Sequence, residues 1–162
     1  MQTSIKIGLL LLFTEDTDSK GTHDALIKQY QEKDFVQING RWYFFTDPFA
    51  TLYSIEEAIL LCELNGVVLG SVETEDIAIR GWLSDQGWGV FAGRGFGTSG
   101  RRIGNLWMWT STGKLFTYTA WRLGQPDDTS TDSCMDLQGD LGWFDWDCLT
   151  DTPMMFFCEQ SN

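Results

Sequence analysis

The acidic residues near the C-terminus are the side chains in this sequence most able to do chemistry. From Leu123 to Asn162 there is no lysine or arginine. The carboxylates in this stretch are Asp127, Asp128, Asp132, Asp136, Asp140, Asp145, Asp147, Asp151 and Glu159. A hard cation such as calcium needs several oxygen ligands close together, so the stretch is a candidate metal site. A solvated acidic surface gives the same composition, and composition alone favours that simpler interpretation.

The overall charge restricts the class of partner. The 162-residue chain has a formal net charge of −12 at pH 7. Nucleic acids and anionic membranes attract basic surfaces, so neither is an expected partner. The apolar run at residues 7–13 is too short to cross a bilayer, and no membrane span is expected. Because Lys6 precedes this run, we predict a signal peptide over residues 1–20 and a secreted protein.

The cysteines indicate disulfides rather than a metal or redox site. The four are Cys62, Cys134, Cys148 and Cys158. An even number in a secreted chain predicts two disulfides, and four cysteines allow three pairings. The single histidine, His23, lies in the polar N-terminal segment, so zinc chemistry and a Ser-His-Asp or Cys-His catalytic group have little support. We therefore expect a binding protein and not an enzyme.

Two other functional patterns carry little weight. Residues 95–100 match the dinucleotide-binding pattern G-x-G-x-x-G. That pattern requires a following helix and an acidic residue about twenty positions later. Here an aromatic strand follows, and Ala120 and Trp121 occupy the later position, so the match is a chance one in a glycine-rich loop. Paired catalytic carboxylates of the glycosidase type stay an open alternative, although no pair stands out among the many acids.

The elements that must position the acidic residues are two helices and several short strands. Ser54 and Glu57 form a capping box at the start of one helix, which ends at Asn65-Gly66. Thr74 caps a second helix that reaches about Ser84. Strands are predicted at residues 42–45 and 67–69 and, after a glycine-rich loop, at 106–109, 116–118, 134–137, 143–145 and 154–158. Helices followed by many short strands indicate an α+β domain. We place this domain at residues 38–160, after a linker at 21–37.

Several motifs, taken in chain order, resemble the C-type lectin-like domain. They are Cys62 in the first helix, Trp109–Gly113, Trp121–Asp128, Cys134, Trp143–Cys148 and Phe157–Glu159. The similarity covers about residues 35–160. The resemblance implies an α+β C-type lectin-like fold with two helices, short antiparallel strands and a long loop region. It also implies the disulfides Cys62–Cys158 and Cys134–Cys148.

The same resemblance implies a calcium-dependent sugar site. Sugar-binding members of the family hold calcium with a Glu-Pro-Asn or Gln-Pro-Asp triplet, an acid two residues before the third cysteine, and the acid of a later Trp-Asn-Asp. The matching residues are Gln125, Asp127, Asp132 and Asp145, which are expected to bind both the ion and the sugar. Pro126 is expected to be cis, and Trp143 is expected to contact the sugar. The Gln-Pro-Asp order implies galactose-type glycans as the ligand.

The sequence departs from the family pattern at two positions that bear on calcium. Phe144 replaces an asparagine, which removes one calcium ligand and one donor to the sugar. Asp132 replaces a glutamate and is shorter by one methylene. We therefore expect one weak calcium site. The alternative is a divergent module that has lost calcium and sugar binding and binds a protein partner.

Overall fold

The structure is a computed structural model that describes residues 35–161, with gaps at 48, 50–51, 75, 89–94, 140–141 and 151–153. In chain order the elements are β1 (Val36–Ile38), β2 (Arg41–Phe45), α2 (Ile55–Leu64), β3 (Val68–Leu69), α3 (Asp76–Asp85), β4 (Phe96–Ile103), β5 (Leu106–Trp109), β6 (Lys114–Leu115), β7 (Ser133–Gln138), β8 (Gly142–Asp147) and β9 (Met155–Glu159). The predicted signal peptide lies outside the described residues. The first strand begins inside the segment predicted as a linker.

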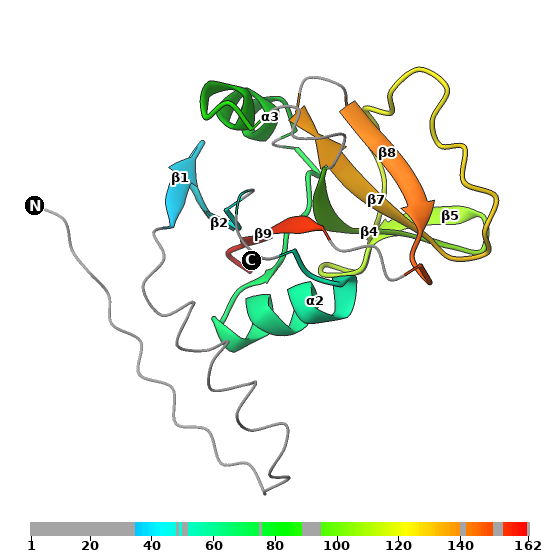
Figure 1. Ribbon diagram of the computed structural model, residues 1–162, viewed down its shortest axis with the longest axis horizontal. Coiled ribbons are helices and arrows are strands. Elements are labelled where there is room, and N and C mark those ends of the chain that lie inside the picture. The colour runs from blue at the N-terminus through cyan, green and yellow to red at the C-terminus, as the bar shows by residue number, and fades with distance from the viewer. Residues whose placement is uncertain are drawn as a thin grey trace, which may run out of the picture. The chain divides into compact units, whose positions relative to one another are not determined.

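Both predicted helices are confirmed. At the start of α2, Ser54 Oγ accepts a hydrogen bond from the backbone N–H of Glu57 at 3.2 Å, and the Glu57 carboxylate accepts one from the Ser54 N–H at 2.9 Å. These reciprocal bonds satisfy two backbone donors that the helix itself leaves free. Helix α2 gives way to Asn65 and then to Gly66, whose φ is +70°. In Figure 1, α2 and α3 lie on opposite sides of β2 and β9.

The sheet is built around β9 and β4. Strand β9 pairs antiparallel with β2 and β3 and parallel with β4. Strand β4 continues the sheet through β5 to β6, and on its other edge it pairs with β7, which pairs with β8. Strands β7 and β8 carry Asp136, Asp145 and Asp147, three of the nine acidic residues of the C-terminal segment.

The structure corrects two strand predictions. Residues 96–103, predicted as a glycine-rich loop, form the eight-residue strand β4. Its glycines permit close packing, because a Cβ at Gly97 would collide with Met154 and one at Gly100 would lie 3.1 Å from the Met135 Cβ. Residues 116–118 do not form the predicted strand: strand β6 covers Lys114–Leu115 and ends there, and Phe116 stacks on Trp109 with ring centroids 4.1 Å apart.

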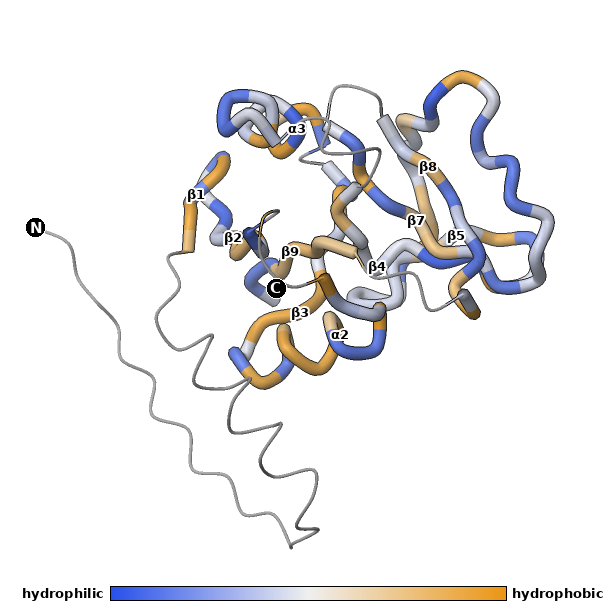
Figure 2. The backbone as a smooth tube through the Cα atoms, in the orientation of Figure 1, coloured by the Kyte–Doolittle hydropathy of each residue, from blue (hydrophilic) through white to orange (hydrophobic). Residues whose placement is uncertain are grey.

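Two disulfides and an aromatic core hold these elements together. Cys62–Cys158 joins α2 to β9, and Cys134–Cys148 joins β7 to the end of β8, so both predicted pairings are confirmed. Figure 2 shows that the loop between β6 and β7, which lies outside this core, is mostly hydrophilic. Among the described residues, no helix has the length and apolar character needed to cross a bilayer.

Candidate functional site

The loop between β6 and β7 lies along the outer edge of β8. The backbone N–H of Trp143 donates to the Ala120 carbonyl at 2.9 Å, and the Arg122 N–H donates to the Trp143 carbonyl at 3.0 Å. Further along, the Asp145 N–H donates to the side-chain Oε1 of Gln125 at 3.1 Å. An unpaired strand edge leaves backbone groups without partners, and here the loop supplies them. The Gln125 amide thus takes the place of a backbone partner.

Asp145 anchors the same loop from the β8 side. Its Oδ1 accepts the backbone N–H of Asp127 at 2.8 Å, and its Oδ2 accepts that of Asp128 at 3.1 Å. The Gln125–Pro126 peptide bond is cis, as expected. Asp127 is exposed, and its Oδ1 accepts a hydrogen bond from Gln125 Nε2 at 2.8 Å. The structure therefore brings Gln125, Asp127 and Asp145 together.

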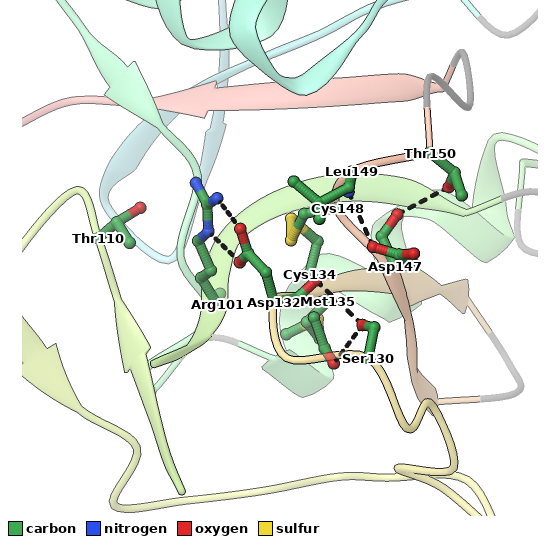
Figure 3. Close-up of a disulfide and its surroundings, with 12 residues drawn as sticks. Arg101, Thr110, Ser130, Asp132, Cys134, Met135, Asp147, Cys148, Leu149 and Thr150 are labelled. Carbon is green, nitrogen blue, oxygen red and sulfur yellow. Dashed lines mark hydrogen bonds and ion pairs between the residues drawn. A yellow bond between two sulfur atoms is a disulfide. The ribbon is translucent and has the colours of Figure 1, made fainter. Parts of the chain in front are cut away.

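Asp132 lies apart from these three residues and pairs with Arg101. Asp145 is opposite Met135 in the β7–β8 register, and Arg101 is opposite Cys134 in the β4–β7 register. Because successive side chains of a strand alternate between faces, Cys134 and Asp145 point to opposite faces of the hairpin. Asp132 accepts hydrogen bonds from Arg101 Nε at 2.6 Å and from Arg101 Nη2, as Figure 3 shows.

Asp128 and Asp132 are held as carboxylates by their neighbours. Hydrogen bonds from Arg101 lower the pKa of Asp132 below its ordinary value. Partial burial by itself raises the pKa of Asp128, but hydrogen bonds from Ser130 and Ser133 outweigh this effect and lower the pKa. The Ser133 hydroxyl donates to Asp128 Oδ2 at 2.6 Å. Both groups are therefore ionised at neutral pH and used to order residues 128–133.

The aromatic residues predicted near the site have structural roles. Trp143, expected to contact a sugar, is 0% exposed, and its Nε1 donates to Asp76 Oδ1 at 2.6 Å. The structure places this indole in the core, where it presents no surface to a ligand. Phe144 is half-buried, and the guanidinium of Arg122 lies 5.2 Å from the centre of its ring.

In this arrangement the four predicted ligands do not fit a calcium ion. Calcium needs six to eight oxygen atoms directed at one point. Both carboxylate oxygens of Asp145 accept backbone N–H groups, Gln125 Oε1 accepts the Asp145 N–H, and Asp132 is bound to Arg101. Phe144 offers no side-chain oxygen. In the part of the chain that the structure describes, no three acidic, histidine or cysteine side chains gather where they could hold a metal.

Arg101 is the residue near the site that the sequence did not predict. It lay in a segment interpreted as a glycine-rich loop, and its partner Asp132 is 31 positions away. Arg102 also reaches this region, since its Nη2 donates to the Ser130 carbonyl. A sequence signal was present, because adjacent arginines are unusual in a chain with only 11 lysine and arginine residues and a net charge of −12.

Solved structures with a similar fold include carbohydrate-recognition domains and lectins. The Ca2+-independent C-type lectin SPL-2 from Saxidomus purpuratus is 28% identical, with a TM-score of 0.62, and covers 77% of this chain and 89% of its own. The SPL-1–GlcNAc complex is 25% identical, with a TM-score of 0.62, and covers 80% and 93%. The mouse scavenger receptor C-type lectin carbohydrate-recognition domain is 22% identical, with a TM-score of 0.61, and covers 79% and 94%. No protein-family model and no curated protein sequence matches the chain.

Proposed function

The chain has the C-type lectin-like fold, and from this premise we propose that it is a secreted carbohydrate-binding protein with a preference for galactose-type sugars. The proposed sugar site is the loop Gln125-Pro126-Asp127. One observation carries the proposal: the Gln125 amide and the exposed Asp127 carboxylate lie side by side on a loop that Asp145 holds against β8.

An amide beside a carboxylate suits two neighbouring sugar hydroxyls. Gln125 Nε2 is a donor and the Asp127 carboxylate is an acceptor, so one hydroxyl can accept a hydrogen bond while the next one donates. Hydrogen bonds to an ionised carboxylate are roughly twice as strong as those between neutral groups. The order of donor and acceptor along the loop selects the orientation of the hydroxyl pair. In the family that this chain resembles, the Gln-Pro-Asp order goes with galactose-type sugars.

The loop is fixed before any sugar binds. The Asp145 carboxylate accepts two backbone N–H groups from the loop, and the backbone N–H of Asp145 donates to Gln125 Oε1. Ordering a flexible loop on binding costs free energy, and a loop already held in place avoids most of that cost. Asp145 is thus a positioning residue for Asp127, which is the residue proposed to touch the sugar.

The compared structures support the class of ligand. SPL-1 is in complex with GlcNAc, and SPL-2 is described as a C-type lectin that is independent of calcium. Secretion is supported by the two disulfides of the described domain, because such bonds form and persist in oxidising compartments.

Titration calorimetry with galactose and mannose tests the proposal. The wild-type protein is expected to bind galactose more tightly than mannose. Asp127→Asn removes the charged acceptor and should weaken galactose binding by about 10- to 100-fold, from the usual strength of a hydrogen bond to a charged group. The matched control is Asp85→Asn at the end of α3, which is exposed and should not change the affinity.

The double variant Gln125→Glu, Asp127→Asn reverses the order of acceptor and donor and should shift the preference toward mannose. A folded wild-type protein that binds neither sugar would overturn the proposal. That result would favour the alternative, a divergent module that binds a protein partner.

A further inference from the structure

Arg101 and Asp132 form a bidentate ion pair at the end of the loop between β6 and β7. This loop contains the proposed sugar site, Gln125-Pro126-Asp127, and is called the sugar loop below. Arg101 Nε donates to Asp132 Oδ1 at 2.6 Å, and Arg101 Nη2 donates to Asp132 Oδ2. The planar guanidinium matches the two oxygens of a carboxylate, which makes this pairing more directional than a contact with lysine. In Figure 3 the Arg101 side chain points directly at Asp132, beside the Cys134–Cys148 disulfide. Each oxygen of Asp132, one of the acids expected to bind calcium, therefore accepts a hydrogen bond from Arg101.

The pairing of β4 with β7 determines the position of Arg101. Strand β4 pairs with β7 at Gly97 and Asp136 and again at Arg101 and Cys134, with a shift of register between the two points. A bulge of this kind changes the direction in which following side chains point. It brings Arg101 opposite Cys134, two residues after Asp132. The cation thus comes from a strand in the middle of the sheet, and its side chain is 34% exposed.

A second arginine of the same strand holds the same loop. Arg102 Nη2 donates to the carbonyl of Ser130. The Ser130 hydroxyl in turn donates to Asp128, and the Ser130 N–H donates to Asp128 Oδ1 at 3.1 Å. Residues 128–132 are therefore tied to β4 at two points. Arg101 and Arg102 together carry two positive charges, which is the charge of one calcium ion.

We propose that Arg101, assisted by Arg102, takes the structural place of a bound calcium ion, so that the sugar loop is ordered and binds its ligand without metal. The claim that the loop is ordered without metal concerns the free protein. The claim that it binds its ligand without metal rests on the proposed sugar-binding function. The carboxylate oxygens of Asp132 and Asp145 and the Gln125 Oε1 each accept a hydrogen bond from the protein, and only Asp127 is exposed with an oxygen that these bonds leave open.

Thermal unfolding with calcium chloride or with EDTA is the first test. A ligand present at about 100 times its Kd raises the melting temperature of a domain of this size by roughly 8 °C. The wild-type protein is expected to melt at the same temperature in 5 mM calcium and in 5 mM EDTA, within about 1 °C. Galactose binding, measured in both buffers, is expected to be equal. A higher melting temperature in calcium, or galactose binding lost in EDTA, would overturn the inference.

Variants of the ion pair are the second test. Arg101→Gln leaves Asp132 without its counter-charge and should lower the melting temperature and weaken galactose binding by up to about 5-fold, because both side chains of the pair are partly exposed. The matched control is Arg122→Gln, whose side chain lies over the Phe144 ring at the same end of the domain and which should bind galactose like the wild type. The double variant Arg101→Gln, Asp132→Asn should recover much of the lost affinity, because neither group then remains unpaired.

The outcomes separate this inference from the proposed function. If EDTA abolishes galactose binding, the protein is a lectin but Arg101 does not replace a metal. If no sugar binds and melting is unchanged by calcium and by EDTA, the metal-free order of the loop stands and the proposed function fails. If Arg101→Gln binds galactose and melts like the wild type, the role given to Arg101 is wrong.

Discussion

Asp136 offers the sharpest test of the packing beneath the site. It lies on β7 opposite Phe144, and its Oδ2 accepts a hydrogen bond from Gln138 Nε2 at 3.3 Å. Its Oδ1 is buried and has no hydrogen-bond partner among the described residues. Burial raises the pKa of this carboxyl from 3.8 to about 7, although hydrogen bonds from Gln138 and from the Gly95 backbone oppose the shift. The folded protein therefore contains an acid that stays protonated until the pH approaches about 7.

The sign of the pH dependence follows from this shift. The unfolded chain releases the Asp136 proton near pH 3.9, whereas the folded protein keeps it until about pH 7. Between these values the folded state binds more protons, so its stability falls as the pH rises. The contribution is complete below about pH 4 and lost above about pH 7. At about 1.4 kcal/mol per pH unit, the loss is at most about 4 kcal/mol.

Asp136→Asn measures this effect, because asparagine has a similar shape and no charge. Urea unfolding followed by tryptophan fluorescence should give nearly equal stabilities for the variant and the wild type at pH 4.5. The variant should become more stable than the wild type by pH 8, by up to about 4 kcal/mol. Burial also raises the pKa of Glu159, but Glu159 is present in both proteins and its contribution cancels in the difference.

Asp85→Asn is the control for a general charge effect, because Asp85 is exposed at the end of α3. Its stability difference from the wild type should be small and constant with pH. A difference between Asp136→Asn and the wild type that is likewise constant from pH 4.5 to 8 would refute the reasoning. It would mean that the folded protein does not hold Asp136 in its protonated form.

Two further predictions concern the scaffold of the sugar loop. Gly142 has φ +98°, and a Cβ there would lie 2.6 Å from the Ala120 carbonyl oxygen, so Gly142→Ala should cost about 2 kcal/mol in urea unfolding and weaken galactose binding. Gly104→Ala, where φ is +62° and nothing lies within 4 Å, should cost less and leave binding unchanged; equal effects would contradict the steric argument. The double variant Cys134→Ala, Cys148→Ala removes a disulfide with a sequence separation of 14 and should lower the free energy of unfolding by about 3 kcal/mol. Both proteins are measured without reductant, and a loss below about 1 kcal/mol would contradict this prediction.

Much of the scaffold could be predicted from local patterns. The capping box of Ser54 and Glu57 fixes the start of α2, because its two hydrogen bonds need only residues three positions apart. Both disulfides and the two helices are confirmed, and the resemblance supplied the pairing that four cysteines alone leave open. The calcium ion, the sugar and its type stay predictions, and the contacts of Asp132 and Asp145 favour a loop that needs no metal.

The sequence by itself determined the fold class, the helices and the Gln125-Pro126-Asp127 loop, since periodicity, caps and short motifs are written in neighbouring residues. Only the tertiary structure decided which side chain each acid meets. The alternation of side chains along β7 and β8 directs Asp145 to the loop, and the register shift in β4 brings Arg101 to Asp132, 31 positions away. Trp143 was expected to contact the sugar, but the tertiary structure buries it completely and gives its Nε1 a hydrogen bond to Asp76, 67 positions away. These side-chain contacts depend on pairing between strands that are distant in the sequence, and a local sequence pattern does not specify that pairing.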